Sequence, residues 1–216
     1  MFHVKHQIEY IRFAERELIE SLYLKNAQKL EDYLNQLLWW NDKINLVSRG
    51  VSRETLQKHI EHSLIVSASR LFKEASSVID TGTGGGLPGI PLGIVNPDKK
   101  ILLNDIVSKK IMACKQMVLK LGLNNITLKE GSIGNVPIEK EEIVVSKHAF
   151  KINDLVELLG EKKWKGIILL KGKHEVEREI APVSKPLKLK VYSLDVFDDS
   201  FYDGKALVEI KQIENE

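Results

Sequence analysis

The chain reads Ser77-Val78-Ile79-Asp80-Thr81-Gly82-Thr83-Gly84-Gly85-Gly86-Leu87-Pro88-Gly89-Ile90 at its most informative point. A short β-rich run leads into a glycine-dense loop, and Pro88 stands where a helix can begin, because the first turn of a helix tolerates proline. Glycine allows positive φ angles and lets a ligand approach the main chain closely. Since ligands bind at the carboxyl ends of strands in open α/β sheets, this stretch predicts a ligand-binding strand–loop–helix unit.

Two nucleotide-like cofactors are compatible with this loop. Gly84, Gly86 and Gly89 satisfy the dinucleotide fingerprint G-x-G-x-x-G. The acid-x-G-x-G-x-G pattern of methyltransferases that use S-adenosylmethionine also fits, with its members at Asp80, Gly82, Gly84 and Gly86. A carboxylate at the strand end suits a ligand that carries an ammonium and a sulfonium group, and it would repel a pyrophosphate. The loop therefore favours S-adenosylmethionine over a nicotinamide dinucleotide.

A second acid ends the next predicted strand, Ile101-Leu102-Leu103-Asn104-Asp105. Both cofactors require an acid about twenty residues after the loop, where it accepts hydrogen bonds from the ribose hydroxyls. Asp105 therefore predicts an adenosine-type ligand without distinguishing between the two. The same side chain could also cap the helix that follows.

From residue 76 onward, short β-rich runs alternate with helical runs, of which 109–121 is the clearest. The predicted strands are 77–81, 100–105, 126–130, 142–146, 166–171, 191–197 and 206–213. Such alternation predicts a parallel sheet with helices on both faces. The last two runs are joined by a turn-rich segment and should pair antiparallel. This is the layout of a class I methyltransferase: a Rossmann-like, mostly parallel seven-stranded sheet with an antiparallel last strand.

The first third of the chain has a different texture. Apolar residues up to about position 73 recur at helical spacing, interrupted at 39–48, and a further helix is predicted over 53–72. We therefore expect an N-terminal helical subdomain over 1–74 and a Rossmann-like methyltransferase domain over 75–216.

Composition excludes several classes of protein. Hydrophobic residues at 43% and charged residues at 29% are typical of a globular protein, and a net charge of +2 permits a nucleic-acid partner without requiring one. The single cysteine, Cys114, excludes an intrachain disulfide framework and a cysteine-rich zinc site, and we expect it to be buried. His59 and His62 have helical spacing but no evident third ligand, so no metal is expected.

The sequence shows no pattern of a membrane span or a signal peptide. No apolar stretch is long enough to span a bilayer, and the first residues lead into a charged pattern instead of an apolar signal core. We therefore expect a cytoplasmic protein. Nothing in the sequence demands a dimer, and a monomer is expected.

The sequence resembles the RsmG (GidB) family, bacterial methyltransferases that modify guanine N7 in small-subunit ribosomal RNA. The resemblance covers nearly the whole chain in order. It rests most strongly on Asp80 to Leu92, and it also includes Trp40-Asn41, Asn45-Leu46-Val47-Ser48, His59-Ile60 with Ser63, Ser108-Lys109-Lys110, Gly122-Leu123-Asn124-Asn125-Ile126, Ser146 near Ala149-Phe150, and Leu170-Lys171-Gly172.

The resemblance implies the cofactor and several contacts. It implies S-adenosylmethionine as cofactor and 16S rRNA or the small ribosomal subunit as partner. Gly82 and Leu87 correspond to cofactor-contacting positions, and Ile133 and Gly134 fall where the family also touches the cofactor, at its adenine. The full predicted cofactor site is Asp80, Gly82, Gly84, Gly86, Leu87, Asp105, Ile133 and Gly134.

Two stretches depart from the family pattern. The family carries Ser-Arg-Ala-Phe where this chain reads Ser146-Lys147-His148-Ala149-Phe150, and His62 stands where the family shows an acid. Ser132 replaces a further family arginine. We assign Lys147, His148 and Lys171 to substrate positioning. Because guanine N7 has a free lone pair at neutral pH, no general base is expected.

The predicted function is methyl transfer from S-adenosylmethionine to guanine N7 of 16S rRNA. Two alternatives remain at this point. One is a nicotinamide-dependent oxidoreductase, which the G-x-G-x-x-G match allows. The other is an rRNA-binding ribosome-assembly factor without transfer activity, which the altered Lys147-His148 segment allows.

Overall fold

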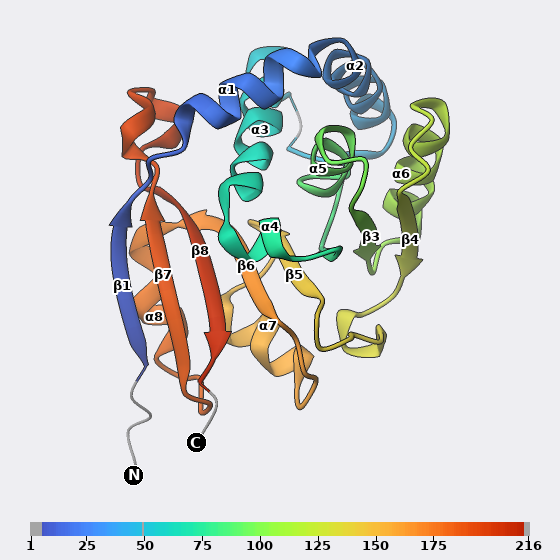
Figure 1. Ribbon diagram of the computed structural model, residues 1–216. Helices are drawn as coiled ribbons and strands as arrows, with labels where there is room; N and C mark the ends of the chain where they lie inside the picture. The colour runs from blue at the N-terminus through green and yellow to red at the C-terminus, as the bar shows by residue number, and fades with distance from the viewer. Residues whose placement is uncertain (1–5, 49, 214–216) are drawn as a thin grey trace.

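The computed structural model describes residues 6–48 and 50–213 of the 216-residue chain. An eight-stranded sheet crosses the molecule in the order β1-β7-β8-β6-β5-β2-β3-β4 (Figure 1). Its strands are β1 (Gln7–Arg12), β2 (Ser77–Thr81), β3 (Lys100–Asp105), β4 (Ile126–Glu130), β5 (Ile143–Lys147), β6 (Gly166–Gly172), β7 (Leu187–Ser193) and β8 (Lys205–Gln212). All neighbours are parallel except the two pairs formed by β8. The predicted class I layout is confirmed.

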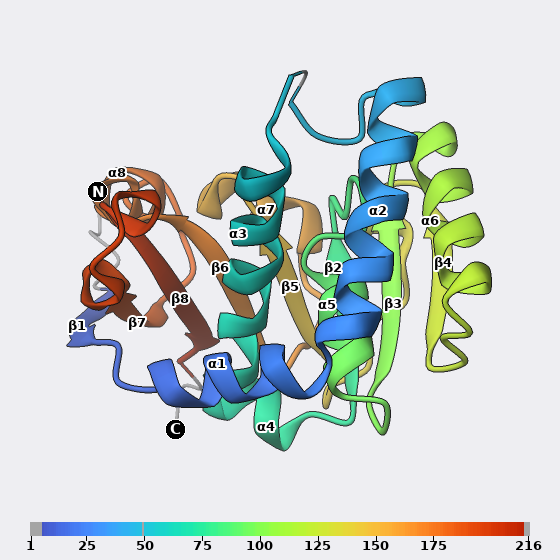
Figure 2. The same ribbon diagram turned by 90° about the horizontal axis from the view of Figure 1, so that it is seen from above.

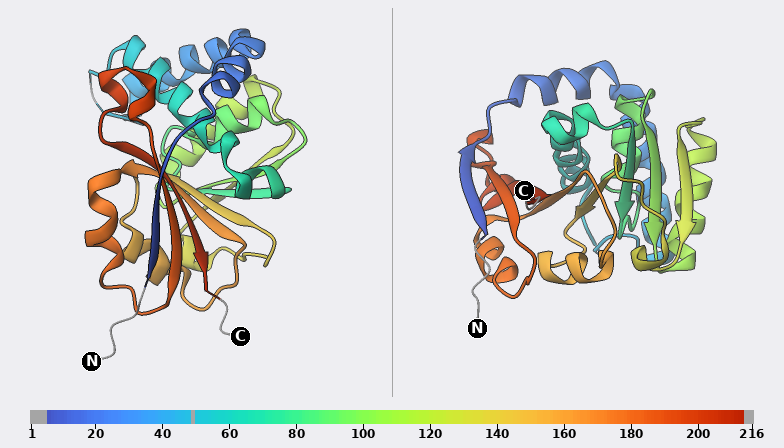
Figure 3. Two further views of the ribbon diagram at one scale, coloured as in Figure 1. Left: turned by 60° about the vertical axis from the view of Figure 1, so that its left-hand side comes forward. Right: turned by 60° about the horizontal axis from the view of Figure 1, so that its bottom comes forward.

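Helices cover both faces of this sheet (Figures 2 and 3). They are α1 (Arg16–Lys25), α2 (Ala27–Ile44), α3 (Arg53–Leu64), α4 (Arg70–Glu74), α5 (Gly89–Val95), α6 (Ser108–Lys120), α7 (Ile152–Leu159) and α8 (Val176–Ile180), with short 3-10 turns η1 (Ile65–Ala68), η2 (Ile133–Asn135), η3 (Lys173–Glu175), η4 (Asp195–Phe197) and η5 (Ser200–Tyr202). Within the described ranges, no helix is both long and apolar enough to cross a membrane.

Two hydrophobic cores follow from the period-two alternation of the strands. In β2, Val78 belongs to the core under the N-terminal helices, whereas its neighbour Ile79 belongs to the core under α7 and α8. In β5, Val145 and Val144 divide in the same way. The N-terminal helices thus share one core with the sheet, and Cys114 is fully buried in it, as predicted.

The connection order creates a topological switch point at β2, and the edge of the sheet at this point is called the crevice below. Strand β2 pairs with β3 on one side and with β5 on the other, so the chain reverses its direction of progress across the sheet at β2. Ligands of open α/β sheets bind outside the carboxyl ends of the strands at such a point. The glycine loop and the Lys147-His148 segment follow β2 and β5, and they therefore meet at this crevice.

The prediction that the first 73 residues are entirely helical is wrong at one element. Gln7–Arg12 forms β1, which pairs in parallel with β7 and adds an eighth strand to the predicted seven. Ile8 and Ile11 are three residues apart, a spacing that also suits a helix, and the half-buried edge strand lacks a continuous apolar face. Tertiary pairing with β7 decides the conformation. Residues 1–5, the start of the predicted subdomain, lie outside the described residues.

Three further boundaries differ from prediction. The expected break at 39–48 begins later, because α2 continues to Ile44 and ends where Asn45 adopts the left-handed conformation with φ 51°. The predicted helix 53–72 divides into α3, η1 and α4, with Ser69 capping the last. The first strand of the antiparallel pair lies at Leu187–Ser193 instead of 191–197, and its last predicted residues form η4.

Helix α2 is fastened directly to the glycine loop. The hydroxyl of Tyr33, fully buried, donates to the carbonyl of Gly85 at 2.9 Å. A Cβ on Gly85 would lie 2.6 Å from Leu37 of the same helix, so the loop and α2 are in contact without spare room. The packing of the N-terminal helices therefore fixes the position of the loop.

We expect Tyr33→Phe to lower the free energy of unfolding by about 1–2 kcal/mol, because it leaves the buried Gly85 carbonyl without a partner. Denaturant titration measures this. The matched control is Tyr10→Phe, since Tyr10 is 56% exposed and donates to a surface carboxylate of Glu177. Equal effects of the two substitutions would contradict a role for the buried bond.

Candidate active site

The glycine loop has a backbone conformation that other residues rarely adopt. Gly82, Gly84 and Gly86 have φ angles of +68°, +56° and +95°. A Cβ on Gly82 would lie 2.5 Å from the Cβ of Ala149, so the loop after β5 passes directly over the loop after β2. The predicted glycines are thus brought together with the segment that follows Lys147.

Asp80 ties the two ends of the loop together. Its carboxylate is fully buried, and Oδ2 accepts hydrogen bonds from Thr83 Oγ1 at 2.5 Å and from the Gly89 amide at 2.8 Å. Its other oxygen, Oδ1, has no hydrogen-bond partner among the described residues. Burial is the main cause that raises the pKa of Asp80 to about 7, and the two hydrogen bonds oppose it.

Asp105 holds the outer side of the loop. Its Oδ2 accepts from the Gly84 amide at 2.9 Å, and its Oδ1 accepts from the Val107 amide at 3.0 Å. The cap position of α6 is Val107, so Asp105 is not the N-cap residue itself. Both carboxylate oxygens keep further lone pairs, and the carboxylate is held rigidly at the crevice.

The remaining predicted cofactor residues surround the same crevice. Leu87 follows the glycines and is 6% exposed. Ile133 and Gly134 form η2 after β4, where the Gly134 amide donates to Ser132 Oγ at 3.2 Å. The side chain of Ile133 is buried in the core under α7, so a ligand would meet this turn through its main chain and Gly134.

Asn104 is a site residue that the sequence patterns did not single out. Its side-chain amide donates to the carbonyls of Lys129 and Gly131, and its oxygen accepts from Thr81 Oγ1 at 2.9 Å. It therefore links the ends of β2, β3 and β4. Its position directly before Asp105, at the end of a buried strand, is the feature of the sequence that could have identified it.

A basic cluster faces the glycine loop from β5 and α3. Lys147 Nζ lies 2.8 Å from His59 Nδ1, and the rings of His148 and the fully buried His62 have centroids 5.7 Å apart. Neither ring nitrogen of His62 has a hydrogen-bond partner among the described residues. Lys147 and His148, both predicted as site residues, thus come together with His59 and His62, which the sequence did not assign to the site.

The cluster is electrostatically self-repelling. Desolvation first, and then the neighbouring Lys205, lower the pKa of Lys147 to about 7, while Asp80 acts in the opposite direction. Desolvation first, and then Lys147, lower the pKa of His59 to about 3. At neutral pH the His59 ring is therefore uncharged, and the pH lies close to the pKa of Lys147.

Lys171 lies beside this cluster but is engaged elsewhere. Its side chain is 4% exposed and forms an ion pair with the equally buried Glu179. Glu179 also accepts from the Ile152 amide at 2.8 Å at the start of α7. The ammonium of Lys171 is therefore held on the α7–α8 side, next to His148 but not free to contact a ligand.

The depressed pKa of Lys147 predicts a pH dependence of stability. In the unfolded chain the amine keeps its proton up to about 10.5, whereas in the folded protein it loses it near 7, so stability should rise with pH between these values. We expect Lys147→Met to be more stable than the parent by about 1–2 kcal/mol at pH 7, after allowance for solvent screening.

That difference should shrink toward zero as the pH approaches 10.5, as unfolding titrations across the range can measure. Lys151→Met is the control, because Lys151 is an exposed residue four positions away. A gap that stays constant with pH would contradict the desolvation of Lys147.

Comparison with known proteins identifies the family. A family model described as rRNA small subunit methyltransferase G (GidB) matches residues 26–196. The ribosomal RNA small subunit methyltransferase G of Chlorobium chlorochromatii is 35% identical over 84% of this chain and 82% of its own length. The protein of the same name from Chlorobium luteolum is 33% identical over 91% and 90%.

Solved structures show the same fold at low identity. A SAM dependent methyltransferase from Aquifex aeolicus has a TM-score of 0.56 at 13% identity, covering 74% of this chain and 93% of its own. The ribosomal protein L11 methylase from Lactobacillus delbrueckii has a TM-score of 0.51 at 15% identity, covering 73% and 79%. The fold is thus that of class I methyltransferases, and the family match shows that the chain belongs to the rRNA small subunit methyltransferase G family.

Proposed function

We propose that this protein transfers a methyl group from S-adenosylmethionine to N7 of a guanine in 16S rRNA. Membership of the methyltransferase G family supports the reaction and the RNA. The observation that carries the proposal is the placement of Asp105 and the positive-φ glycines on the crevice at the carboxyl end of β2.

The residues present fit this cofactor. Gly82 and Gly84 offer main chain without side chains, Asp105 offers carboxylate lone pairs to ribose hydroxyls, and Gly134 in η2 is the proposed contact to the adenine. Oδ1 of Asp80, which has no hydrogen-bond partner among the described residues, is a further acceptor at the end of β2. When bound, the cofactor supplies an electrophilic methyl group.

The same loop fits a nicotinamide dinucleotide poorly. A pyrophosphate needs free amide donors, but the Gly84 amide donates to Asp105 and the Gly89 amide donates to Asp80. The amides of Gly86 and Leu87 both donate to the Thr83 carbonyl. With every one of these donors engaged and two carboxylates beside them, the oxidoreductase alternative is not favoured.

The protein's task in this reaction is alignment. Guanine N7 carries a lone pair at neutral pH, so no side chain need remove a proton, and the rate depends on holding N7 in line with the methyl group and away from water. Lys147 and His148 lie at the mouth of the crevice and can donate hydrogen bonds to the base or its phosphates. Lys171 acts indirectly, because its ion pair with Glu179 holds β6 against α7.

The proposal also covers the compartment, the oligomeric state, the metal requirement and the division of the chain. We further propose that the protein works in the cytoplasm as a monomer. It needs no metal, because methyl transfer to N7 requires no Lewis acid. Among residues 6–48 and 50–213, no three His, Cys, Asp or Glu side chains are grouped as a metal site. The division into an N-terminal helical part, 1–74, and a methyltransferase part, 75–216, is retained with β1 assigned to the sheet.

Calorimetric titration with S-adenosylhomocysteine, in parallel with NAD, tests the cofactor. We expect micromolar binding of the former alone, and about tenfold weaker binding in Asp105→Asn, because a hydrogen bond to a charged acceptor is weakened. Asp98→Asn, at an exposed aspartate, is the control. Binding of NAD alone would remove the methyltransferase proposal.

Substrate positioning is tested by methyl incorporation into small-subunit rRNA. We expect Lys147→Ala to lower the rate about tenfold or more while the affinity for S-adenosylhomocysteine stays unchanged, because misaligned reactants lose rate. Lys147→Arg should restore part of the rate, and Lys151→Ala should match the parent. An unchanged rate in Lys147→Ala would exclude this lysine from the substrate site.

A further inference from the structure

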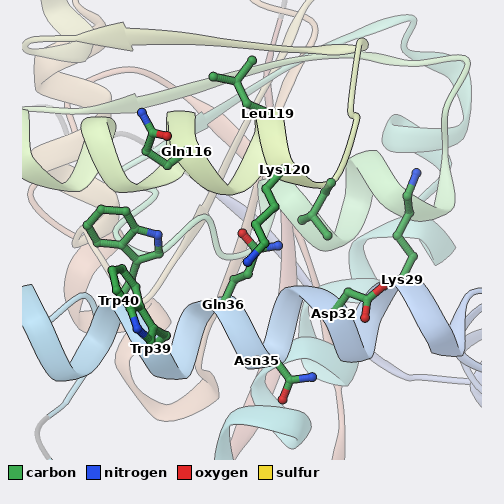
Figure 4. Close-up of a pocket in the computed structure, with 10 residues that line it drawn as sticks. Lys29, Asp32, Asn35, Gln36, Trp39, Trp40, Gln116, Leu119 and Lys120 are labelled. Carbon is green, nitrogen blue, oxygen red and sulfur yellow. The ribbon is translucent and has the colours of Figure 1, made fainter.

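A long groove lies between α2 and α6 on the surface of the molecule (Figure 4). Its volume is about 880 Å³. Gln36, Trp39 and Trp40 line it from α2, and Gln116, Leu119 and Lys120 line it from α6. The two helices run antiparallel along it, because the tryptophans lie beside Gln116 and Lys29 lies at the opposite end.

One end of the groove carries an exposed aromatic face. Trp39 is 57% exposed, and its ring meets that of Trp40 edge-on with centroids 4.9 Å apart. The ammonium of Lys43 lies 5.8 Å from the Trp39 ring centroid. A large indole held in place by a second ring and flanked by a cation is a platform on which an unpaired base can stack.

The charged residues that line the groove are Lys120 from α6 and Lys29 and Asp32 from α2. Helix α6 contains four lysines and no acidic residue: Lys109, Lys110, Lys115 and Lys120. Lys110 lies 4.0 Å from Asp105, whereas the other three form no ion pair with any residue that the structure describes. Lys120 and Lys29 in the lining, with Lys109 and Lys115 elsewhere on α6, outnumber the single lining acid, so the groove beside the aromatic platform is complementary to a polyanion with exposed bases.

The lining argues against an apolar protein helix as occupant. Gln36, Gln116 and Lys120 interrupt the surface between Trp40 and Leu119, so no continuous apolar stripe is available to a partner helix. Amide side chains can instead both donate to and accept from the edges of bases. Along α2, Lys29 to Trp40 spans about 16 Å at 1.5 Å per residue, enough for a short run of nucleotides.

The groove is close to the reacting centre. The inner sides of its two helices hold the glycine loop, through Tyr33 on the Gly85 carbonyl and Cys114 on the Gly84 carbonyl. Helix α6 starts at Ser108, three residues after Asp105, and runs from there to Gln116, which lies beside the tryptophans, and on to Lys120. A strand leaving the crevice can therefore follow α6 to Trp39.

We propose that the α2–α6 groove binds a single-stranded rRNA segment flanking the target guanine, with a base stacked on Trp39 and phosphates contacted by the lysines of α6. This inference rests on the proposed rRNA methyltransferase function. It assigns a second, outer contact that determines affinity for the RNA without touching the cofactor.

The test measures binding of deproteinised small-subunit rRNA to the full chain at several salt concentrations. Trp39→Ala should weaken binding about 5- to 100-fold, and Trp39→Phe should retain most of the affinity, as expected for base stacking. Lys120→Gln should weaken binding and reduce the slope of log K against log salt by about one. Lys163→Gln, at an exposed lysine between α7 and β6, is the charge-matched control and should behave as the parent.

S-adenosylhomocysteine affinity is measured in each variant and should not change, which excludes misfolding. A single-stranded oligoribonucleotide should compete for the groove, whereas a fully paired RNA should compete poorly. If Trp39→Ala and Lys120→Gln bind rRNA as the parent does, the groove proposal is overturned and the proposed function stands. If they bind rRNA normally but lose the assembled subunit, the groove contacts protein and the proposal is again overturned. Failure of the parent to bind S-adenosylhomocysteine would instead overturn the proposed function.

Discussion

Two carboxylates hold the glycine loop by its own amide hydrogens, and the geometry of the rest of the site depends on this restraint. Asp80 accepts from the Gly89 amide and Asp105 accepts from the Gly84 amide. A loop with three positive-φ glycines has much conformational freedom to lose, so it needs such bonds to remain in one shape. The same bonds consume the amides that a phosphate would need, so one device both orders the loop and selects against a pyrophosphate.

The opposite side of the loop is held just as firmly. Its carbonyls at Gly84 and Gly85 accept from Cys114 on α6 and from Tyr33 on α2. Two helices separated by more than sixty residues in sequence thus contact one loop, and their apolar faces form a single core with the sheet. The N-terminal helices are therefore part of the machinery that shapes the crevice, and the outer faces of the same helices form the α2–α6 groove.

The sequence was sufficient for what depends on local pattern. The glycine loop, the acids after β2 and β3 and the alternation of strands and helices predicted the sheet, its antiparallel last strand and the crevice. Strand β1 was not predictable, since its conformation depends on pairing with β7 far along the chain. The same limit applies to the site: His59 meets Lys147 across 88 residues, and strand position alone did not predict the ion pair of Lys171 with Glu179.

Two of the sequence positions that depart from the resemblance lie next to each other in the structure. His62, at a position where the family carries an acid, faces His148, which lies in the segment where the family carries an arginine. An acid left at position 62 would be a buried charge without a guanidinium beside it, whereas a neutral imidazole carries no such cost.

The exchange also alters the charge that the substrate meets. Methylation at N7 moves the positive charge of the sulfonium onto the base, and a fixed cation beside the base would oppose that movement. Neutral histidines and a lysine whose pKa lies at about 7 leave hydrogen-bond donors in place while reducing that opposition. On the proposed function, the Lys147-His148 segment is thus a different solution to the same alignment problem, with no need for the bidentate arginine of the family.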